Sequence, residues 1–174
     1  MSESPFDRTL LGAVYAQHHE ELFRYAVRFT GDADLAEDIV QEAFLRLAER
    51  PPAEPQALRA WLFRATTTIA IDAHRTRKRR NALAEAGIAR LPMAELGPDP
   101  AQAAEQADLR ERVRDALDQL DPRDRSILLM REEGFAHHEI AEAVGTTTKS
   151  VGTMIARALD KLARHLELDE SDLS

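Results

Sequence analysis

Residues 138–166, HEIAEAVGTTTKSVGTMIARALDKLARHL, decide the fold of the second half of the chain. A short helical pattern ends at Val144, a turn begins at Gly145, and a longer pattern follows with apolar residues three and four positions apart. A short helix, a tight turn containing glycine and a longer helix are typical of a helix-turn-helix unit. The stretch therefore predicts such a unit near the end of the chain.

Two more helices are predicted directly before this unit. Apolar residues from Leu109 to Leu120 mark the first of them. Asp121 and Pro122 begin the second, because aspartate caps a helix and proline loses nothing at the first helical position, where its missing N–H needs no partner. This second helix is predicted to end at Gly134.

The first half of the chain has three helical patterns. The first begins near Leu11 and stops at Thr30-Gly31, and either Asp32 or Asp34 can cap the second. A loop with three prolines follows, and the third pattern covers residues 57–80. The predicted inner face of the second helix consists of Ala36, Ile39, Val40, Ala43, Phe44 and Leu47.

Residues 82–107 sustain no periodicity and include Leu-Gly-Pro-Asp-Pro at 96–100, which is typical of a linker. No alternating strand pattern is present in the sequence. We therefore expect an all-α fold of two small helical domains joined by a flexible linker. The expected ranges are 1–81 for the first domain, 82–107 for the linker, 108–168 for the helix-turn-helix domain and 169–174 for an acidic tail.

The charge changes sign along the sequence. The net charge is −8, yet residues 59–80 hold seven Lys and Arg against one acid, and residues 145–165 hold four against one. Contacts with phosphates are local, and charges are screened over roughly 8–10 Å at physiological ionic strength. Two basic segments can therefore bind nucleic acid while the acidic remainder repels it, and that remainder suggests a second, basic partner.

Composition excludes several other classes of protein. Apolar residues make up 44% and charged residues 31% of the chain, which is ordinary for a soluble protein. No apolar run approaches the roughly 18 residues that a membrane span requires, and residues 1–7 lack the pattern of a signal peptide. We expect a cytoplasmic protein without membrane insertion. The absence of cysteine excludes disulfides, a thiol nucleophile and cysteine-ligated zinc.

Four motifs stand in order along the chain: DLAEDIVQEAFLRL at 34–47, LRAWLFR at 58–64, AID at 70–72 with the basic residues of 75–80, and a stretch from LDPRDR at 120–125 to EIAEAVG at 139–145. Together they resemble the extracytoplasmic-function (ECF) sigma factors of bacterial RNA polymerase. The resemblance implies a sigma factor that directs polymerase to promoters and assists their opening, with no catalysis and no cofactor. It also implies three partners, which are core RNA polymerase, promoter DNA and an anti-sigma factor, and association with the nucleoid when polymerase is bound.

The resemblance assigns polymerase binding and the minus-ten promoter element to the first domain. Trp61 offers a flat face to an unpaired base beside Arg59 and Arg64, and the basic cluster that follows can hold phosphates. The loop at 51–58 is implied to lie where a flipped base is captured. The implied polymerase-binding residues are Glu37, Asp38, Gln41 and Glu42. The implied minus-ten residues are Arg59, Trp61, Arg64, Arg75, Arg77, Lys78, Arg79 and Arg80.

The N-terminal end of the last helix is implied to enter the major groove at the minus-thirty-five element. Family members often carry Val-Lys-Ser-Arg-Leu where this chain has Val151-Gly-Thr-Met-Ile155, so two positions have lost their charge. We expect recognition through backbone, threonine hydroxyl and shape contacts more than through arginine–guanine pairs. The implied residues are Thr148, Lys149, Gly152, Thr153, Arg157 and Lys161. The acidic linker is implied to run toward the RNA exit path.

Simpler interpretations stay open for the DNA- and polymerase-binding candidates. The cluster at 75–80 also suits a solvated helix C-terminus, and Trp61 also suits a packed core position. Glu37 and Asp38 also suit the first turn of a helix, where acids are favoured.

Other polar groups have both a structural and a functional interpretation. The pairs His18-His19 and His137-His138 resemble metal ligands, but adjacent helical side chains point about 100° apart, and His18 fits a core position better. The run from Thr66 to Thr68 fits packing better than phosphorylation. The tail at 166–174 fits a frayed helix end, with masking of a basic segment as the alternative.

Two other functions compete with the sigma factor. Residues 121–162 alone fit a helix-turn-helix regulator that binds duplex DNA without polymerase. The His and Glu pairs fit a helical metalloenzyme, which would carry stoichiometric metal.

Overall fold

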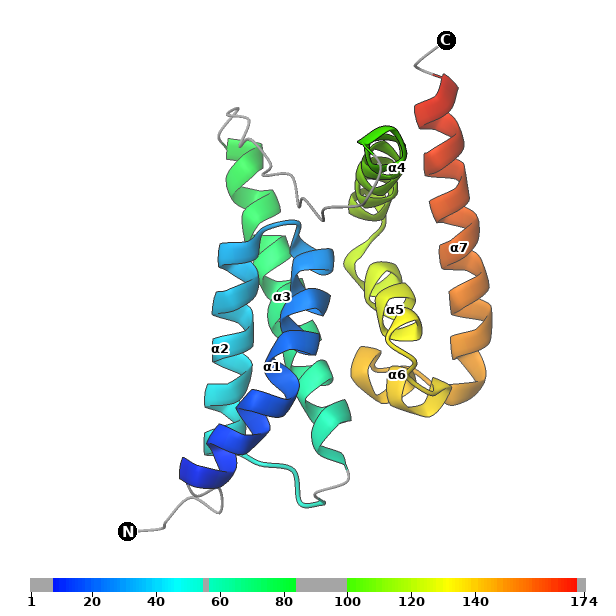
Figure 1. Ribbon diagram of the computed structural model, residues 1–174. Helices are drawn as coiled ribbons and strands as arrows, with labels where there is room; N and C mark the ends of the chain where they lie inside the picture. Colours follow the sequence, from blue (N-terminus) through cyan, green and yellow to red (C-terminus); the bar gives the residue numbers. More distant parts are fainter. Residues whose placement is uncertain (1–7, 55–56, 84–99, 172–174) are drawn as a thin grey trace.

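The computed structural model describes residues 8–54, 57–83 and 100–171. These residues contain helices and no strand, which confirms the all-α prediction. Figure 1 shows α1, α2 and α3 gathered on one side of the molecule, with α5, α6 and α7 on the other. The helices are α1 (Arg8–Thr30), α2 (Ala33–Glu49), α3 (Leu58–Leu83), α4 (Pro100–Gln119), α5 (Pro122–Glu132), α6 (His137–Val144) and α7 (Thr148–Ser171).

The turn between α1 and α2 follows directly from its sequence. Gly31 has a φ of 68°, a left-handed conformation that glycine adopts without steric cost. Asp32, and not Asp34, caps α2, because its carboxylate accepts a hydrogen bond of 3.0 Å from the N–H of Leu35. Every residue of the predicted inner face of α2 is buried.

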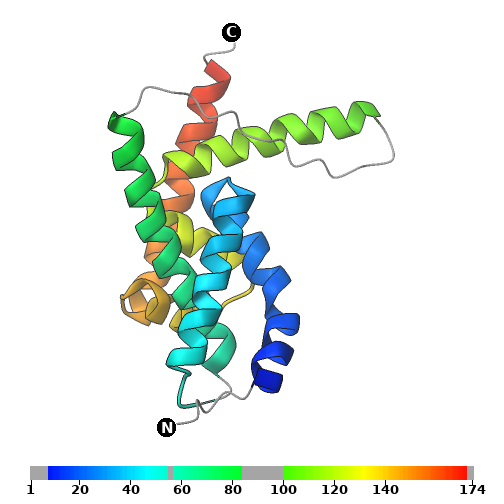
Figure 2. The same ribbon diagram turned by 90° about the vertical axis from the view of Figure 1, so that its left-hand side faces the viewer.

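Helix α4 begins at Pro100, inside the segment expected to be linker. Its first turns, Pro-Ala-Gln-Ala-Ala-Glu-Gln, are rich in good helix formers but carry no apolar stripe, so periodicity alone does not reveal the helix. Figure 2 shows α4 lying across the direction of the other helices and projecting beyond them. Residues 84–99 lie outside the described part of the chain, and the domain boundaries stay predictions.

The helix-turn-helix unit has the predicted form. The Asp121 carboxylate caps α5 by accepting hydrogen bonds from the N–H groups of Arg123 (3.0 Å) and Asp124 (3.1 Å). Gly145, with a φ of 68°, ends α6 and starts the turn into α7. Ile140 of α6 and Val151 of α7 are fully buried and pack their helices against the core.

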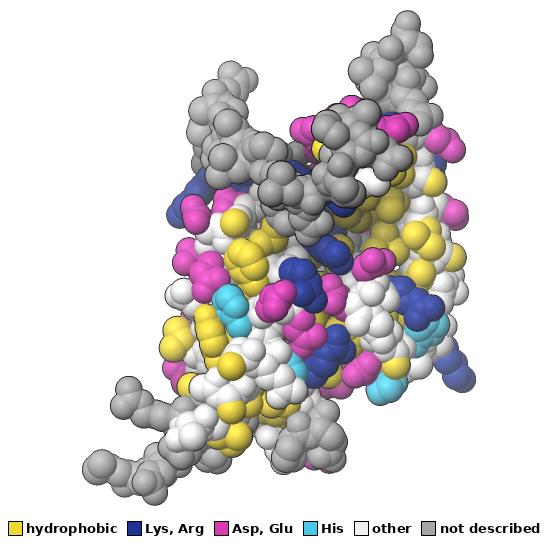
Figure 3. Space-filling view, viewed as in Figure 1, with side chains coloured by type: hydrophobic (Ala, Val, Ile, Leu, Met, Phe, Trp, Pro, Cys, Tyr) yellow, Lys and Arg dark blue, Asp and Glu magenta, His cyan; other side chains and the backbone are white. Residues whose placement is uncertain are grey.

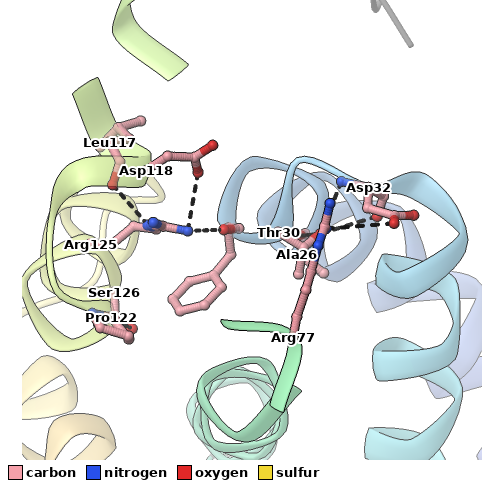
Figure 4. Close-up of polar contacts among 10 residues, drawn as sticks. Ala26, Thr30, Asp32, Arg77, Leu117, Asp118, Pro122, Arg125 and Ser126 are labelled. Atoms are coloured by element: carbon pink, nitrogen blue, oxygen red, sulfur yellow. Dashed lines mark hydrogen bonds and ion pairs between the residues drawn. The ribbon is translucent and has the colours of Figure 1, made fainter. Parts of the chain in front are cut away.

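One hydrophobic cluster joins both halves of the molecule. The Phe63 ring of α3 lies 4.6 Å, centroid to centroid, from the Phe135 ring in the turn after α5. The fully buried Arg125 of α5 donates hydrogen bonds to the Leu117 carbonyl (2.9 Å) and to the Phe29 carbonyl of α1. Figure 4 shows this guanidinium lying between the two helical groups. The two halves therefore pack directly on one another, which the sequence did not predict.

No helix within the described ranges is both long and apolar enough to span a membrane.

Candidate nucleic-acid interface

Arg59, a minus-ten candidate, is held between the two halves of the molecule. Its guanidinium carbon lies 5.0 Å from the centre of the Phe63 ring and 4.1 Å from that of Phe135. Its Nε donates to Glu21 at 3.1 Å and its Nη2 to the backbone carbonyl of Glu133 at 3.2 Å. Cation–π contacts with two neighbouring rings and charged hydrogen bonds to two oxygen acceptors thus hold this cation in place.

The neighbours of Arg59 on α3 are only partly exposed. Arg64 donates a hydrogen bond of 2.7 Å to Glu142 of α6, and 40% of its side chain is exposed. Trp61 is half-buried and packs on the edge of the core. The tryptophan thus combines the core position with partial exposure, and its role in base stacking stays a prediction.

The basic cluster at the end of α3 is more open. Arg75, Arg79 and Arg80 are exposed. Arg77 is half-buried and lies 3.7 Å from the carboxylate of Asp32, as Figure 4 shows. The side chain of Lys78 lies outside the described part of the structure. Three arginines along one helix end can contact successive phosphates.

The outer face of α2 carries the polymerase-binding candidates. Asp38 and Gln41 are exposed, while the Glu42 carboxylate accepts a hydrogen bond of 2.9 Å from Arg46. Glu37 is half-buried and lies 3.1 Å from Nε2 of His19 on α1. Leu45, on the same helix, is 61% exposed and is not one of the site residues that the sequence predicts.

Helix α1 adds aromatic groups beside this face. The Tyr15 ring lies 4.7 Å from the ring of His19 and 4.8 Å from that of Phe44, with part of the Tyr15 side chain exposed. Burial, and then the Glu37 carboxylate, raise the pKa of Tyr15. The helical spacing of Tyr15, His19 and Phe23 is the sequence signal that could have revealed this row.

The N-terminal end of α7 presents a polar, open surface. Thr148, Lys149, Gly152 and Thr153 are exposed, and so is Arg157 one turn further on. A Cβ at Gly152 would meet only Cε1 of His137, at 3.8 Å, so the backbone there is open to close approach.

Lys161 differs from the other candidates on α7. Its ammonium group lies 3.5 Å from the Asp121 carboxylate and donates a second hydrogen bond to Asp124. The hydrogen bond to Asp124 is the main cause that raises the pKa of Lys161. This side chain lies about 20 Å along the helix axis from Thr148, at 1.5 Å per residue. It joins α7 to the start of α5.

His18 and Thr67 have structural partners. His18 is buried and lies 2.6 Å from Glu21, the carboxylate that also holds Arg59. Thr66 and Thr67 are buried, and Thr67 bonds to the Tyr25 hydroxyl at 2.7 Å. Among the residues that the structure describes, no group of three or more His, Asp or Glu could hold a metal ion.

Comparison with known proteins matches both halves of this fold. The family described as Sigma-70 region 2 matches residues 14–80, and the family described as Sigma-70, region 4 matches residues 110–162. The ECF RNA polymerase sigma factor SigL of Mycobacterium tuberculosis is 32% identical over 165 residues, which cover 92% of this chain and 91% of SigL. The RNA polymerase sigma factor SigV of Bacillus subtilis is 29% identical over 177 residues, which cover 100% of both chains.

Two solved structures share the fold. The sigma factor RpoE from Bartonella quintana, in complex with the anti-sigma factor NepR, has a TM-score of 0.66 at 20% identity and covers 91% of this chain and 97% of its own. CnrH, in complex with the cytosolic domain of CnrY, has a TM-score of 0.65 at 22% identity and covers 96% of this chain and 94% of its own. At these identities the likeness concerns the fold alone.

A helical fold with a region 2 match in its first half and a region 4 match in its second defines a sigma-70 type transcription initiation factor. The likeness to SigL over almost the whole of both chains narrows the class. The chain belongs to the ECF sigma factors of RNA polymerase, and its function is promoter-specific initiation of transcription.

Proposed function

We propose that the α1–α3 half binds core RNA polymerase and the minus-ten element, while the α4–α7 half reads the minus-thirty-five element. The observation that carries this proposal is the position of the two basic segments. They lie at the end of α3 and at the start of α7, in separate halves of the molecule. The expected domain ranges, 1–81 and 108–168 around a linker at 82–107, belong to the same proposal.

The polymerase-binding surface is assigned to the outer face of α2. Asp38 and Gln41 are exposed there, and the exposed Leu45 lies one helical turn beyond Gln41. An apolar side chain beside carboxylates and an amide suits a basic surface that carries an apolar pocket. Glu37 and Glu42 support this face through His19 and Arg46.

Minus-ten binding is assigned to two parts of α3. The exposed Arg75, Arg79 and Arg80, with Arg77 and Lys78, contact phosphates. The half-buried Trp61 stacks on an unpaired base, with Arg59 and Arg64 beside it.

Minus-thirty-five binding is assigned to the exposed start of α7. The hydroxyls of Thr148 and Thr153, the charge of Lys149 and the open backbone at Gly152 face the major groove, and Arg157 lies toward the DNA backbone. A DNA contact by Lys161 stays a prediction, because that ammonium group is engaged with Asp121 and Asp124.

We infer further that the chain catalyses no reaction, needs no cofactor and acts in the cytoplasm, where it joins the nucleoid as part of the polymerase. The partners printed for the two similar structures, NepR with RpoE and CnrY with CnrH, support an anti-sigma factor as a third partner.

Co-elution of the purified chain with core polymerase from its source organism tests this function. We expect micromolar chain to co-elute and Asp38→Lys to weaken binding by about tenfold, since it reverses charge on the proposed surface. Asp34→Lys, the same change on an exposed acid in the first turn of α2, is the matched control and should bind normally. A folded chain that binds duplex DNA but not polymerase would support a plain helix-turn-helix regulator instead.

A further inference from the structure

The start of α6 carries two adjacent histidines, His137 and His138, to which the proposed function gives no role. Both side chains are exposed. Neither imidazole forms a hydrogen bond or an ion pair with another residue in the described part of the chain. The pair therefore presents polar rings that are free to bind a partner outside the molecule.

His137 is the histidine that borders α7. A Cβ placed on Gly152 would lie 3.8 Å from Cε1 of the His137 ring. Adjacent side chains of a helix point about 100° apart, so His138 points in a different direction. The ring of His137 thus lies beside the stretch of α7 that the proposed function places in the major groove.

We propose that His137 is a further DNA contact, whose protonated ring binds a backbone phosphate at the minus-thirty-five element and makes this binding tighter at acidic than at alkaline pH. This inference rests on the proposed function, which assigns the start of α7 to that element. In a helix-turn-helix unit the second helix enters the groove, while the first crosses the DNA backbone. His137 is the first residue of the first helix, α6, so its ring is placed for a phosphate rather than for a base edge.

The charges around the ring favour an anion. Residues 148–159, at the start of α7, include Lys149 and Arg157 and no acid. Figure 3 shows histidine and basic side chains close together around α6 and the start of α7. The free N–H groups at the start of a helix add partial positive charge. A phosphate at this position gains from each of these groups, and a protonated ring adds a full charge.

Helix α6 packs against α3, α5 and α7. Its own acids are engaged elsewhere, because Glu139 accepts a hydrogen bond of 2.9 Å from the N–H of Ala136 and Glu142 accepts one of 2.7 Å from Arg64 of α3. No acid among the described residues pairs with the ring of His137. The other charged groups of the three packed helices near α6 are Arg59 of α3, Arg123, Arg131, Glu132 and Glu133 in and after α5, and Lys149 and Arg157 of α7.

Two measurable quantities report a contact of this kind. Histidine is the side chain whose ordinary pKa places its change of charge between about pH 5 and 8. A phosphate stabilises the charged ring, so DNA binding takes up a proton and the affinity rises as the pH falls through this range. Each phosphate contact also adds about 0.9 to the steepness of log K against log salt. Both the affinity and the salt dependence should therefore change with pH.

Titration of a duplex with the full chain at about pH 6 and about pH 8 tests the inference. A mixed-sequence duplex of about 30 base pairs is the probe, since phosphate contacts are independent of sequence. We expect the native chain to bind about three- to tenfold more tightly at the lower pH, because a phosphate that raises the pKa of an imidazole by one unit changes affinity at most tenfold. The salt slope should be steeper there by about 0.9.

Three variants separate the charge of the ring from its presence. His137→Gln should lose most of the difference between the two pH values. His137→Lys carries a permanent charge, so it should bind tightly at both pH values with the steeper slope. His165→Gln is the matched control, because this histidine of α7 lies about 25 Å along the helix axis from Thr148, and the variant should keep the native difference.

The same pH and salt dependence in His137→Gln and in the native chain would overturn the inference, and so would an equal loss in His165→Gln. Lys149→Gln distinguishes this failure from failure of the proposed function. If Lys149→Gln weakens binding at both pH values while His137→Gln binds as the native chain does, the assignment of α7 to DNA stands and the role of His137 falls. A native chain that binds the duplex at neither pH would overturn both.

Discussion

The guanidinium of Arg125 donates a hydrogen bond to the backbone carbonyl of Phe29, 96 residues earlier in the chain. Phe29 lies in the last turn of α1, where carbonyl groups have no partner within the helix. Arg125 also donates to the Leu117 carbonyl and lies 3.3 Å from the Asp118 carboxylate, and its side chain is fully buried. One cation thus satisfies acceptors from both halves of the molecule.

Replacing Arg125 should therefore destabilise the whole chain. Arg125→Met removes the donor for two backbone carbonyls and an ion pair with Asp118, so we expect the free energy of unfolding to fall by about 3 kcal/mol. Urea denaturation monitored by circular dichroism measures this free energy. Arg123→Met, on the exposed start of the same helix, should change stability by less than about 0.5 kcal/mol. Similar losses in both variants would contradict the structural role of Arg125.

The second prediction concerns alkaline pH. Burial raises the pKa of Tyr25 to about 12, above the ordinary value of 10.0. The neutral hydroxyl is therefore favoured by the fold, so its contribution to stability is complete below pH 10 and is lost as pH rises toward 12. Measured by urea unfolding at a series of pH values, this loss should be much smaller in Tyr25→Phe. Tyr15→Phe should still lose most of this stability over the same pH range. If the two variants follow the same pH dependence, Tyr25 does not titrate as the structure indicates.

Two glycines of the helix-turn-helix unit should respond oppositely to alanine. Gly145 has a φ of 68°, so Gly145→Ala should lower the free energy of unfolding by about 1–2 kcal/mol. Gly152 lies inside α7 with only His137 near the site of a Cβ, at 3.8 Å, so Gly152→Ala should raise it by about 0.5–1 kcal/mol. Thermal and urea unfolding of the full chain check both signs. Stabilisation by alanine at Gly145 would mean that the turn differs from the one described.

Substitutions of Lys149 and Lys161 should have different effects on the salt dependence of DNA binding. Phosphate contacts are independent of sequence, so a mixed-sequence duplex of about 30 base pairs is a sufficient probe. Lys149→Gln should weaken binding and reduce the slope of log K against log salt by about 1. Lys161→Gln should leave the slope nearly unchanged and lower stability instead, because Asp124 loses its partner. An equal reduction of the slope by both variants would restore Lys161 as a DNA contact.

The helices could largely be predicted from local patterns. The inner face of α2 recurs at helical spacing and is entirely buried, and the Asp121-Pro122 signal marks the start of α5. Helix α4 could not be found in this way, because its alanines, glutamines and acids lack an apolar stripe over the first turns. Helix α4 forms because its residues favour a helix and because it packs against α7.

The partners of the site residues could not be predicted from local patterns. Phe63 is fully buried, but no local pattern shows that Phe135 covers it from the other half. Charge shows that Arg59 and Arg64 are cations, but their pairing with Glu21 and Glu142 depends on contacts across 38 and 78 residues. Long-range pairs of this kind arise from the packing of whole helices.

The engagement of Arg59 and Arg64 also bears on how a scarce factor moves through a cell full of DNA. A chromosome offers millions of competing sites, and each unpaired cation adds to the non-specific affinity that traps a protein on them. With Arg59 and Arg64 paired inside the molecule and a net charge of −8, the free chain has two cations fewer to hold it on non-specific DNA. Each copy therefore spends less time on the wrong sequence, and more copies are available to polymerase.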